Sequence, residues 1–240
     1  MKLVLHKADS RGFANHGWLQ ANYSFSFANY YNENKMHFGA LRVLNDDVIA
    51  PKMGFGMHPH NNMEIISIPL KGILKHKDNM HKQWQEVRTG EVQIMSAGIG
   101  VEHSEINGSL DEHLNLFQIW IIPNKENVTP RYDQKLFNEN ERKNKLQTLV
   151  SSIDEDKSDS LKIHQDARIS RINLNEKNSF TYTIKSKNHG VYVMNIYGEF
   201  ILDSKTLKTR DAIEVSETNS FEITAKATSE ILFIEVPLNF

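Results

Sequence analysis

Two short segments of this chain place metal-binding side chains two residues apart. His58 and His60 flank a proline, and His103 and Glu105 flank a serine. In an extended strand the side chains at positions i and i+2 project from one face, so each segment offers half of a metal site. If the two strands face each other inside a barrel, three imidazoles and one carboxylate converge. Such a set of nitrogen and oxygen ligands suits Fe, Mn, Ni, Cu or Zn.

The residues around these pairs favour inward-pointing ligands. Pro59 fixes its φ angle and cannot donate to a sheet, so the first pair should lie at a strand start or a sheet edge. Two glycines shortly before His103 suit a tight bend that turns this histidine inward. Glu64 shares the parity of His60 and could be a fifth ligand, a partner of an imidazole N–H or a simple hydrogen-bonding residue. We favour the imidazole partner.

A competing interpretation places these histidines on polar surface loops. For a single His-x-His pair that interpretation is the better one, because short motifs match by chance. A second pair of ligands with the same spacing, in the same β-rich half, shifts the balance toward a metal site. We expect the other histidines of this half that follow the first pair to be solvated or structural: His76, His81 and His113.

Composition narrows the chemistry further. The 240 residues include 28 Lys and Arg against 30 Asp and Glu, a formal charge of −2, and no dense basic run. Direct binding to nucleic acid is therefore not expected. The chain has no cysteine, which excludes disulfides, thiolate nucleophiles and iron–sulfur clusters. Any metal must be held by histidine and carboxylate.

The location of the protein is predicted from its apolar segments. Polar residues interrupt the first aliphatic stretch too early for a signal peptide. No apolar stretch approaches the roughly 18 residues that a membrane span requires. We therefore expect a soluble, cytoplasmic protein without membrane contacts, and we expect it to be a monomer.

The elements that must position the ligands are strands. Short segments rich in Ile, Val and aromatic residues alternate with Gly, Asn or Asp turns, which predicts an all-β barrel or sandwich. The predicted strands are Ala40–Val43, Ile65–Leu70, Gly72–Lys75, Glu91–Met95, Leu114–Ile122, Val191–Ile196, Phe200–Leu202, Phe221–Thr224 and Glu230–Val236. The segment Leu114–Ile122 is apolar at both parities, so we expect it to be buried on both faces.

A single stretch resembles a helix, and it lies near the middle of the chain. Residues Asn138 to about Val150 carry a weak apolar stripe behind many charges, and a polar stretch at 151–160 follows, suited to a surface connection. We place one domain at 1–137 and the other at 138–240. Nine of the 11 histidines lie within the first 113 residues, so the second domain cannot build an equivalent site.

Several segments together resemble the pirin family of bicupins, and more closely its bacterial quercetinase-like members. The resemblance covers most of residues 10–137 and thins in the second half, where Leu161–Ala167 is the best match. The segments that carry it are His16–Leu19, Phe25–Tyr31, Leu41–Asp47, Gly54–His60, Val92–Gly98, His103–Glu105, Gln118–Ile121 and Thr129–Tyr132.

The resemblance implies two jelly-roll cupin domains, of which the first holds one metal and the second holds none. The ligands that it implies are those derived above from strand parity: His58, His60, His103 and Glu105. Glu105 takes the acidic role that other cupins give to a residue in the position of Glu64. The chain departs from many cupins at Ser96, where they have proline.

The implied activity is that of a metal-dependent dioxygenase resembling quercetin 2,3-dioxygenase, which opens a flavonol-like enediol ring with O2. Fe(II) is the metal we expect by family resemblance, with Ni, Mn, Zn and Cu as alternatives. Glu105 would act as the catalytic base. One alternative is an iron-dependent, redox-sensing regulatory protein that binds a protein partner in transcription. Another is an inactive cupin that binds a sugar or another small molecule.

Overall fold

The computed structural model describes residues 1–155 and 159–240, and within those residues the strands form four sheets, a large and a small one in each half. The large sheet of the first half contains, in spatial order, β12 (Arg131–Leu136), β9 (Glu91–Ser96), β6 (Glu64–Lys71), β11 (Leu114–Ile121), β4 (Leu41–Ile49), β3 (Leu19–Tyr23) and β2 (Gly12–Asn15). Its small sheet contains β5 (Gly54–His60), β10 (Val101–Asn107), β7 (Ile73–Asp78) and β8 (Gln85–Arg88).

The second half repeats this arrangement of sheets. Its large sheet contains β1 (Lys2–His6), β20 (Ala212–Ser216), β17 (His189–Tyr197), β22 (Ser229–Pro237), β15 (Arg168–Leu174), β13 (Gln147–Ser152) and β14 (Leu161–Ile163). Its small sheet contains β16 (Ser179–Thr183), β21 (Ser220–Ala225), β18 (Glu199–Leu202) and β19 (Lys205–Lys208). The prediction of an all-β chain is confirmed, and each predicted strand overlaps an observed one.

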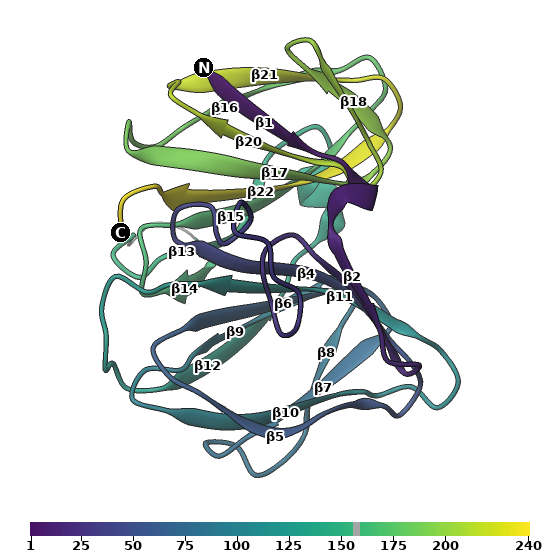
Figure 1. Ribbon diagram of the computed structural model, residues 1–240, viewed down its shortest axis with the longest axis vertical. Coiled ribbons are helices and arrows are strands. Elements are labelled where there is room, and N and C mark those ends of the chain that lie inside the picture. Colours follow the sequence, from purple (N-terminus) through teal and green to yellow (C-terminus); the bar gives the residue numbers. More distant parts are fainter. Residues whose placement is uncertain (156–158) are drawn as a thin grey trace.

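The first strand of the chain joins the two halves in addition to the central connection. Strand β1, at the start of the chain, pairs antiparallel with β20, with Lys2 opposite Ser216 and His6 opposite Ala212. Figure 1 shows this first strand among the strands of the second half, at the opposite end of the molecule from β5 and β10. The N-terminal residues therefore complete the second barrel, while the division at residue 137 stays a prediction.

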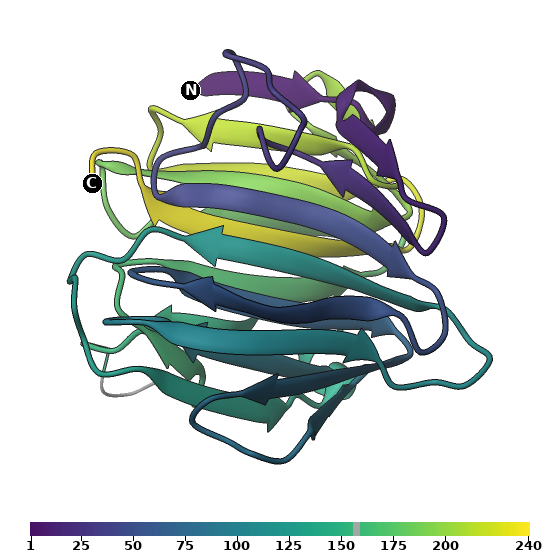
Figure 2. The ribbon, with the colours of Figure 1, turned by 60° about the horizontal axis from the view of Figure 1, so that its bottom comes forward.

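The largest apolar core lies between the two large sheets. It combines buried side chains of the first half, such as Ile66 and Ile119, with side chains of the second half, such as Met194 and Ile234. Figure 2 shows the strands of both large sheets stacked across the middle of the molecule. Apolar burial on this scale is the main stabilising contribution that holds the halves together.

The opposite faces of the same strands line the interiors of the barrels. In the first barrel, Ser67 on β6 and Gln118 on β11 alternate with the core residues and point inward, toward Glu105. In the second barrel the interior is apolar, and the rings of Tyr182 and Phe233 stack with centroids 4.9 Å apart. The predicted burial of both faces of β11 is confirmed, because one face meets the other half and the other encloses a polar site.

The predicted helix is largely wrong. The described residues contain only two short 3-10 helices, η1 (Ala8–Ser10) and η2 (Glu139–Arg142), and strand β13 follows the second one. The side chain of Asn138 caps η2, and Asn144 adopts a positive φ of 53° that ends the helical path. Pairing of β13 with β14 and β15 then overrides the weak helical pattern.

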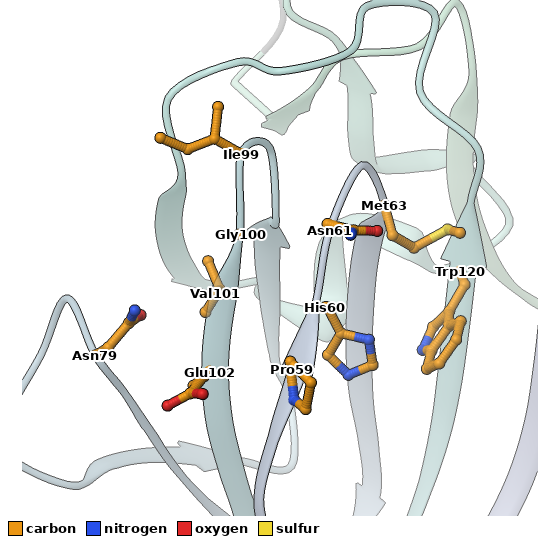
Figure 3. Close-up of a pocket in the computed structure, with 10 residues that line it drawn as sticks. All are labelled: Pro59, His60, Asn61, Met63, Asn79, Ile99, Gly100, Val101, Glu102 and Trp120. Atoms are coloured by element: carbon orange, nitrogen blue, oxygen red, sulfur yellow. The ribbon is translucent and has the colours of Figure 1, made fainter.

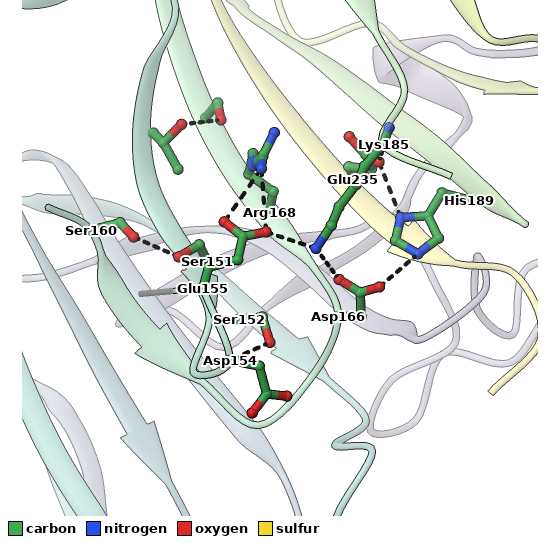
Figure 4. A network of polar contacts seen from close by, with 12 residues as sticks. Ser151, Ser152, Asp154, Glu155, Ser160, Asp166, Arg168, Lys185, His189 and Glu235 are labelled. Carbon is green, nitrogen blue, oxygen red and sulfur yellow. Dashed lines mark hydrogen bonds and ion pairs between the residues drawn. The ribbon is translucent and has the colours of Figure 1, made fainter. Parts of the chain in front are cut away.

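The polar stretch at 151–160 was predicted to be a surface connection, but β13 extends to Ser152. Residues 156–158 lie outside the described residues. Glu155 lies 3.2 Å from Arg168 and 2.7 Å from Lys185, and these pairs belong to a network that reaches His189 (Figure 4). The Nδ1 atom of His189 is 3.0 Å from Oε1 of the buried Glu235. The polar residues here therefore tie the second barrel together.

Among the described residues, no helix has the length and apolar character needed to cross a bilayer.

Candidate metal centre

The two predicted ligand pairs lie on neighbouring strands of the small sheet of the first half. Strand β10 pairs antiparallel with β5, which places His103 opposite His58 and Val101 opposite His60. A β-bulge between His103 and Glu105 shifts the register. Because a bulge changes the direction of the side chains beside it, it lets Glu105 point deeper into the barrel than simple alternation allows.

The three histidines come together as expected. The ring centroids are 4.4 Å apart for His58 and His103, 4.9 Å for His58 and His60, and 4.8 Å for His60 and His103. One potential ligand atom from each of the three lies within 4.8 Å of the others. Glu105 belongs to a second such group, together with His103 and His76. The structure therefore places Glu105 beside His103 rather than equally close to all three imidazoles.

The hydrogen bonds around the imidazoles leave nitrogens available for a metal. Nδ1 of His58 lies 2.7 Å from the carbonyl oxygen of Gly56, so it carries the proton and donates, and Nε2 keeps its lone pair. Nε2 of His60 and both ring nitrogens of His103 are buried without a hydrogen-bond partner. Buried polar atoms normally have partners, so these nitrogens fit a bound cation.

Burial keeps two of the predicted ligands neutral. It lowers the pKa of His60 to about 4, with a further contribution from His58 that outweighs the opposite effect of Glu105. It also lowers the pKa of His103 to about 4, although Glu105 raises that value and the neighbouring histidines lower it. Neutral imidazole is the form that binds metals, so these side chains need not release a proton at neutral pH.

Glu105 is fully enclosed and held by three polar side chains. Its Oε1 atom accepts from Ser67 Oγ and Gln93 Nε2, each at 3.0 Å, and its Oε2 atom accepts from Gln118 Nε2 at 2.6 Å. Burial raises the pKa of Glu105, but contacts with His76 and Ser67, among others, outweigh it and lower the pKa to about 2. The carboxylate is therefore ionised at neutral pH and can hold a cation or accept a proton.

His76 was expected to be solvated or structural, and the structure places it in a buried, structural position beside the predicted ligands. It is completely buried on β7, opposite Glu105 in the register of β7 and β10, with its Nδ1 4.0 Å from Oε1 of Glu105. Its Nε2 lies 2.9 Å from Asp78 Oδ2, and its ring stacks on Tyr132. The spacing of His76 and Asp78, two residues apart on a strand, could have indicated this role.

Glu64 corrects one expectation. It does not contact an imidazole of the site; it accepts a hydrogen bond from Ser96 Oγ at 2.6 Å, across the pairing of β6 with β9. Burial raises the pKa of Glu64 to about 7, although Ser96, the backbone of His164 and Arg131 lower it. The parity argument fails here because a turn between His60 and Glu64 moves the chain from the small sheet to the large one.

The predicted ligands line a cavity of about 230 Å³ whose walls combine aromatic and polar side chains. The aromatic residues are Phe27, Phe55 and Trp120, and the polar ones besides the ligands are Asn45, Asp47 and Gln118. Two of the lining residues, His60 and Trp120, also border an outer pocket of about 610 Å³. Figure 3 shows both rings on one side of that pocket, with the exposed side chains of Asn79 and Glu102 on the other side. His60 and Trp120 therefore separate the cavity of the predicted ligands from the outer pocket.

Sequence reasoning missed the polar residues that hold Glu105. Ser67, Gln93 and Gln118 are polar residues with an apolar neighbour on each side in the sequence, and all three point into the barrel. A polar residue at an inward position of a buried strand needs a partner, which is the pattern that could have indicated them.

Comparison with known proteins agrees with the geometry of the site. A family model described as Pirin matches residues 5–121, and one described as Quercetinase C-terminal cupin domain matches residues 149–236. A quercetin 2,3-dioxygenase of Escherichia coli K12 is 41% identical over 235 residues, which are 98% of this chain and 99% of the relative. The chain belongs to the pirin family. A putative quercetin 2,3-dioxygenase of Zymomonas mobilis is 39% identical to this pirin over 93% of each chain.

A solved structure of a related protein has the same fold and contains a metal ion. The bacterial pirin YhhW of Escherichia coli in complex with nickel(II) superposes on this pirin with a TM-score of 0.91 at 40% identity, covering 98% of this chain and 99% of the other. The expected bicupin fold is therefore confirmed. The donor set of the present site, with its unpartnered imidazole nitrogens, fits a divalent metal.

Proposed function

We propose that this pirin is a metal-dependent dioxygenase that opens a flavonol-like enediol ring with O2. The observation that carries the proposal is the convergence of three imidazoles, two of them with unpartnered buried nitrogens, on a cavity with aromatic walls. Concave, largely apolar cavities with a few polar groups are typical of small-molecule sites. The full-length relatives named quercetin 2,3-dioxygenase support the same substrate class.

The proposed ligands are His58, His60, His103 and Glu105. Fe(II) is our proposal by family resemblance, and nickel is the first alternative because a related structure contains nickel(II). A bound divalent ion would supply a Lewis acid that lowers the pKa of a substrate hydroxyl. The protein holds the imidazoles neutral and ready to bind, since burial keeps the pKa values of His60 and His103 near 4.

Glu105 is the proposed acceptor of the proton from that hydroxyl. It is ionised at neutral pH, and Gln118, Gln93 and Ser67 hold its oxygens in fixed positions. His76, 4.0 Å from the carboxylate and bonded to Asp78 on its other side, is placed to receive the same proton in turn. General-base catalysis requires such a group within hydrogen-bonding reach of the proton it removes.

Aromatic side chains would orient the substrate ring and exclude water. Phe27 meets Trp120 edge to face at a centroid distance of 5.3 Å, and Trp18 meets Phe55 at 5.3 Å. Phe27 and Phe55 border both the cavity of the proposed ligands and an adjoining cavity of about 210 Å³, whereas Trp120 lines only the first and Trp18 only the second. A planar aromatic ring is a good match for walls of this kind.

The experiment is reconstitution of the metal-free protein with Fe(II), Ni(II), Mn(II), Zn(II) or Cu(II), followed by simultaneous measurement of O2 uptake and carbon monoxide release with quercetin. We expect one equivalent of each gas per ring opened, and loss of both in Glu105→Gln and His103→Ala. The matched control is His113→Ala, which removes an exposed histidine of the same half. Stoichiometric metal binding without O2 consumption, for every metal tested, would reject the proposal.

A further inference from the structure

Strand β4 carries two buried polar residues that the metal ligands do not explain. Asn45 and Asp47 are two residues apart, so both project from the face of β4 that lines the barrel interior. They are 2% and 5% exposed, and both border the cavity of the metal ligands and the adjoining aromatic cavity. The Oδ1 atom of each is buried and has no hydrogen-bond partner.

The residue between them, Asp46, has hydrogen-bond partners for both of its carboxylate oxygens. Asp46 faces the opposite side, where its Oδ2 lies 2.8 Å from Arg210 Nε and its Oδ1 accepts from Asn115 Nδ2 at 2.8 Å. Consecutive acidic residues of one strand thus have opposite surroundings. A buried acceptor without a donor destabilises a protein, so two of them side by side at a cavity indicate a ligand that supplies donors.

We propose that Asn45 and Asp47 form a hydroxyl-binding subsite, which recognises a second hydroxyl of the aromatic substrate whose first hydroxyl lies at the histidines. This inference rests on the proposed function for the substrate class. It extends that function by naming the residues that favour a substrate with a further hydroxyl group on its rings. A hydroxyl group both donates and accepts, so it matches an amide oxygen and a carboxyl group together. An unsubstituted ring would leave both oxygens unpaired.

The surroundings of Asp47 favour a neutral ligand over a cationic or anionic one. Burial, followed by the negative charges of Asp46 and Glu105, raises the pKa of Asp47 to about 8. A largely protonated carboxyl at neutral pH does not attract a cation, and Glu105 in the same cavity repels a second anion. The aromatic rings of Phe27 and Phe55 border the same two cavities and would hold the carbon skeleton of a phenolic ligand.

The test compares two flavonols that share the hydroxyl expected to meet the metal. Quercetin carries further hydroxyls on both outer rings, whereas 3-hydroxyflavone carries none. Binding of each to the nickel-loaded protein is measured by fluorescence titration without O2, together with metal content. We expect the wild type to prefer quercetin by at least about tenfold, because a site built around buried acceptors rejects a ligand that lacks the donors.

Substitution should remove that preference selectively. Asp47→Ala and Asn45→Ala should each weaken quercetin binding by about tenfold, leave 3-hydroxyflavone binding unchanged and retain one metal per chain. Asp47→Asn, which keeps a polar group of the same shape, should retain part of the preference. Glu102→Gln is the matched control, because it changes an exposed carboxylate on β10 outside the cavity.

The outcomes separate this inference from the proposed function. Equal affinity of the wild type for the two flavonols, or equal weakening of both by Asp47→Ala, would overturn the subsite even if quercetin is turned over. Selective weakening of quercetin in the variants, without carbon monoxide release by the wild type, would support the subsite and reject the dioxygenase proposal.

Discussion

The hydrogen bond from Gln118 to Glu105 offers the sharpest quantitative prediction. Gln118→Leu keeps the approximate size of the side chain and removes the donor that lies 2.6 Å from Oε2 of Glu105. A hydrogen bond to a charged group contributes about 1.5–3 kcal/mol, and Glu105 is only 2% exposed, so little solvent reaches its carboxylate. The hydroxyl of Ser67, now shared between Glu105 and Gln118, would turn to Glu105 alone and soften the loss.

We therefore expect the free energy of unfolding of the metal-free protein at neutral pH to fall by about 2 kcal/mol. We also expect metal affinity to fall by about 10- to 100-fold, because the group that orients a ligand is lost. Urea denaturation measures the first quantity, and competition with a chelating dye for Zn(II) measures the second. The control is Gln20→Leu, an exposed position on β3. A change below about 0.5 kcal/mol with unaltered affinity would refute the reasoning, since ordinary surface substitutions have effects of that size.

Three further predictions concern other residues of the structure. Arg210→Met should lower the free energy of unfolding by about 2 kcal/mol in urea denaturation, because it removes the partner of the buried Asp46. Arg11, whose Nη1 lies 3.7 Å from the same carboxylate, limits the loss. An unchanged free energy of unfolding would contradict the importance of this contact between the halves. Burial, Asp46 and Glu105 raise the pKa of Asp47 to about 8. The folded metal-free protein therefore keeps a proton that the unfolded chain releases near pH 4. The contribution of Asp47 to the free energy of unfolding declines as the pH rises from about 4 to about 8. Asp47→Asn has no such decline, so urea titrations should show its stability relative to wild type increasing between about pH 5 and pH 8, whereas a constant difference would refute the assignment. Trp120 lies 4.8 Å from His60 between ring centroids, so Cu(II) should quench its fluorescence; Trp120→Phe should lose most of the quenching, and Trp84→Phe should keep it.

The ligand pairs could be predicted because strand parity is a local property. His58 with His60, and His103, follow from the alternation of side chains along β5 and β10, and the pairing of those strands brings them together. The failures come from features that are not local. Glu64 was assigned to the imidazoles by parity, but the chain changes sheets between His60 and Glu64.

His76 and Asp47 were missed for a related reason. Each shares its strand with other polar residues, and which of these face the interior of the barrel depends on the pairing of β7 with β10 and of β4 with β11. The false helix at 138–150 has the same origin, because pairing with β14 and β15 decides the conformation of β13. Periodicity predicted which strands exist, and long-range pairing determined what they surround.

The most direct test of the central claim is X-ray absorption spectroscopy of the protein loaded with one equivalent of nickel(II). The account predicts scattering from three imidazoles and one carboxylate oxygen, with one imidazole lost in each of His58→Ala, His60→Ala and His103→Ala, and with the carboxylate signal lost in Glu105→Ala. A spectrum with fewer than three imidazoles, or one unchanged by these substitutions, would contradict it.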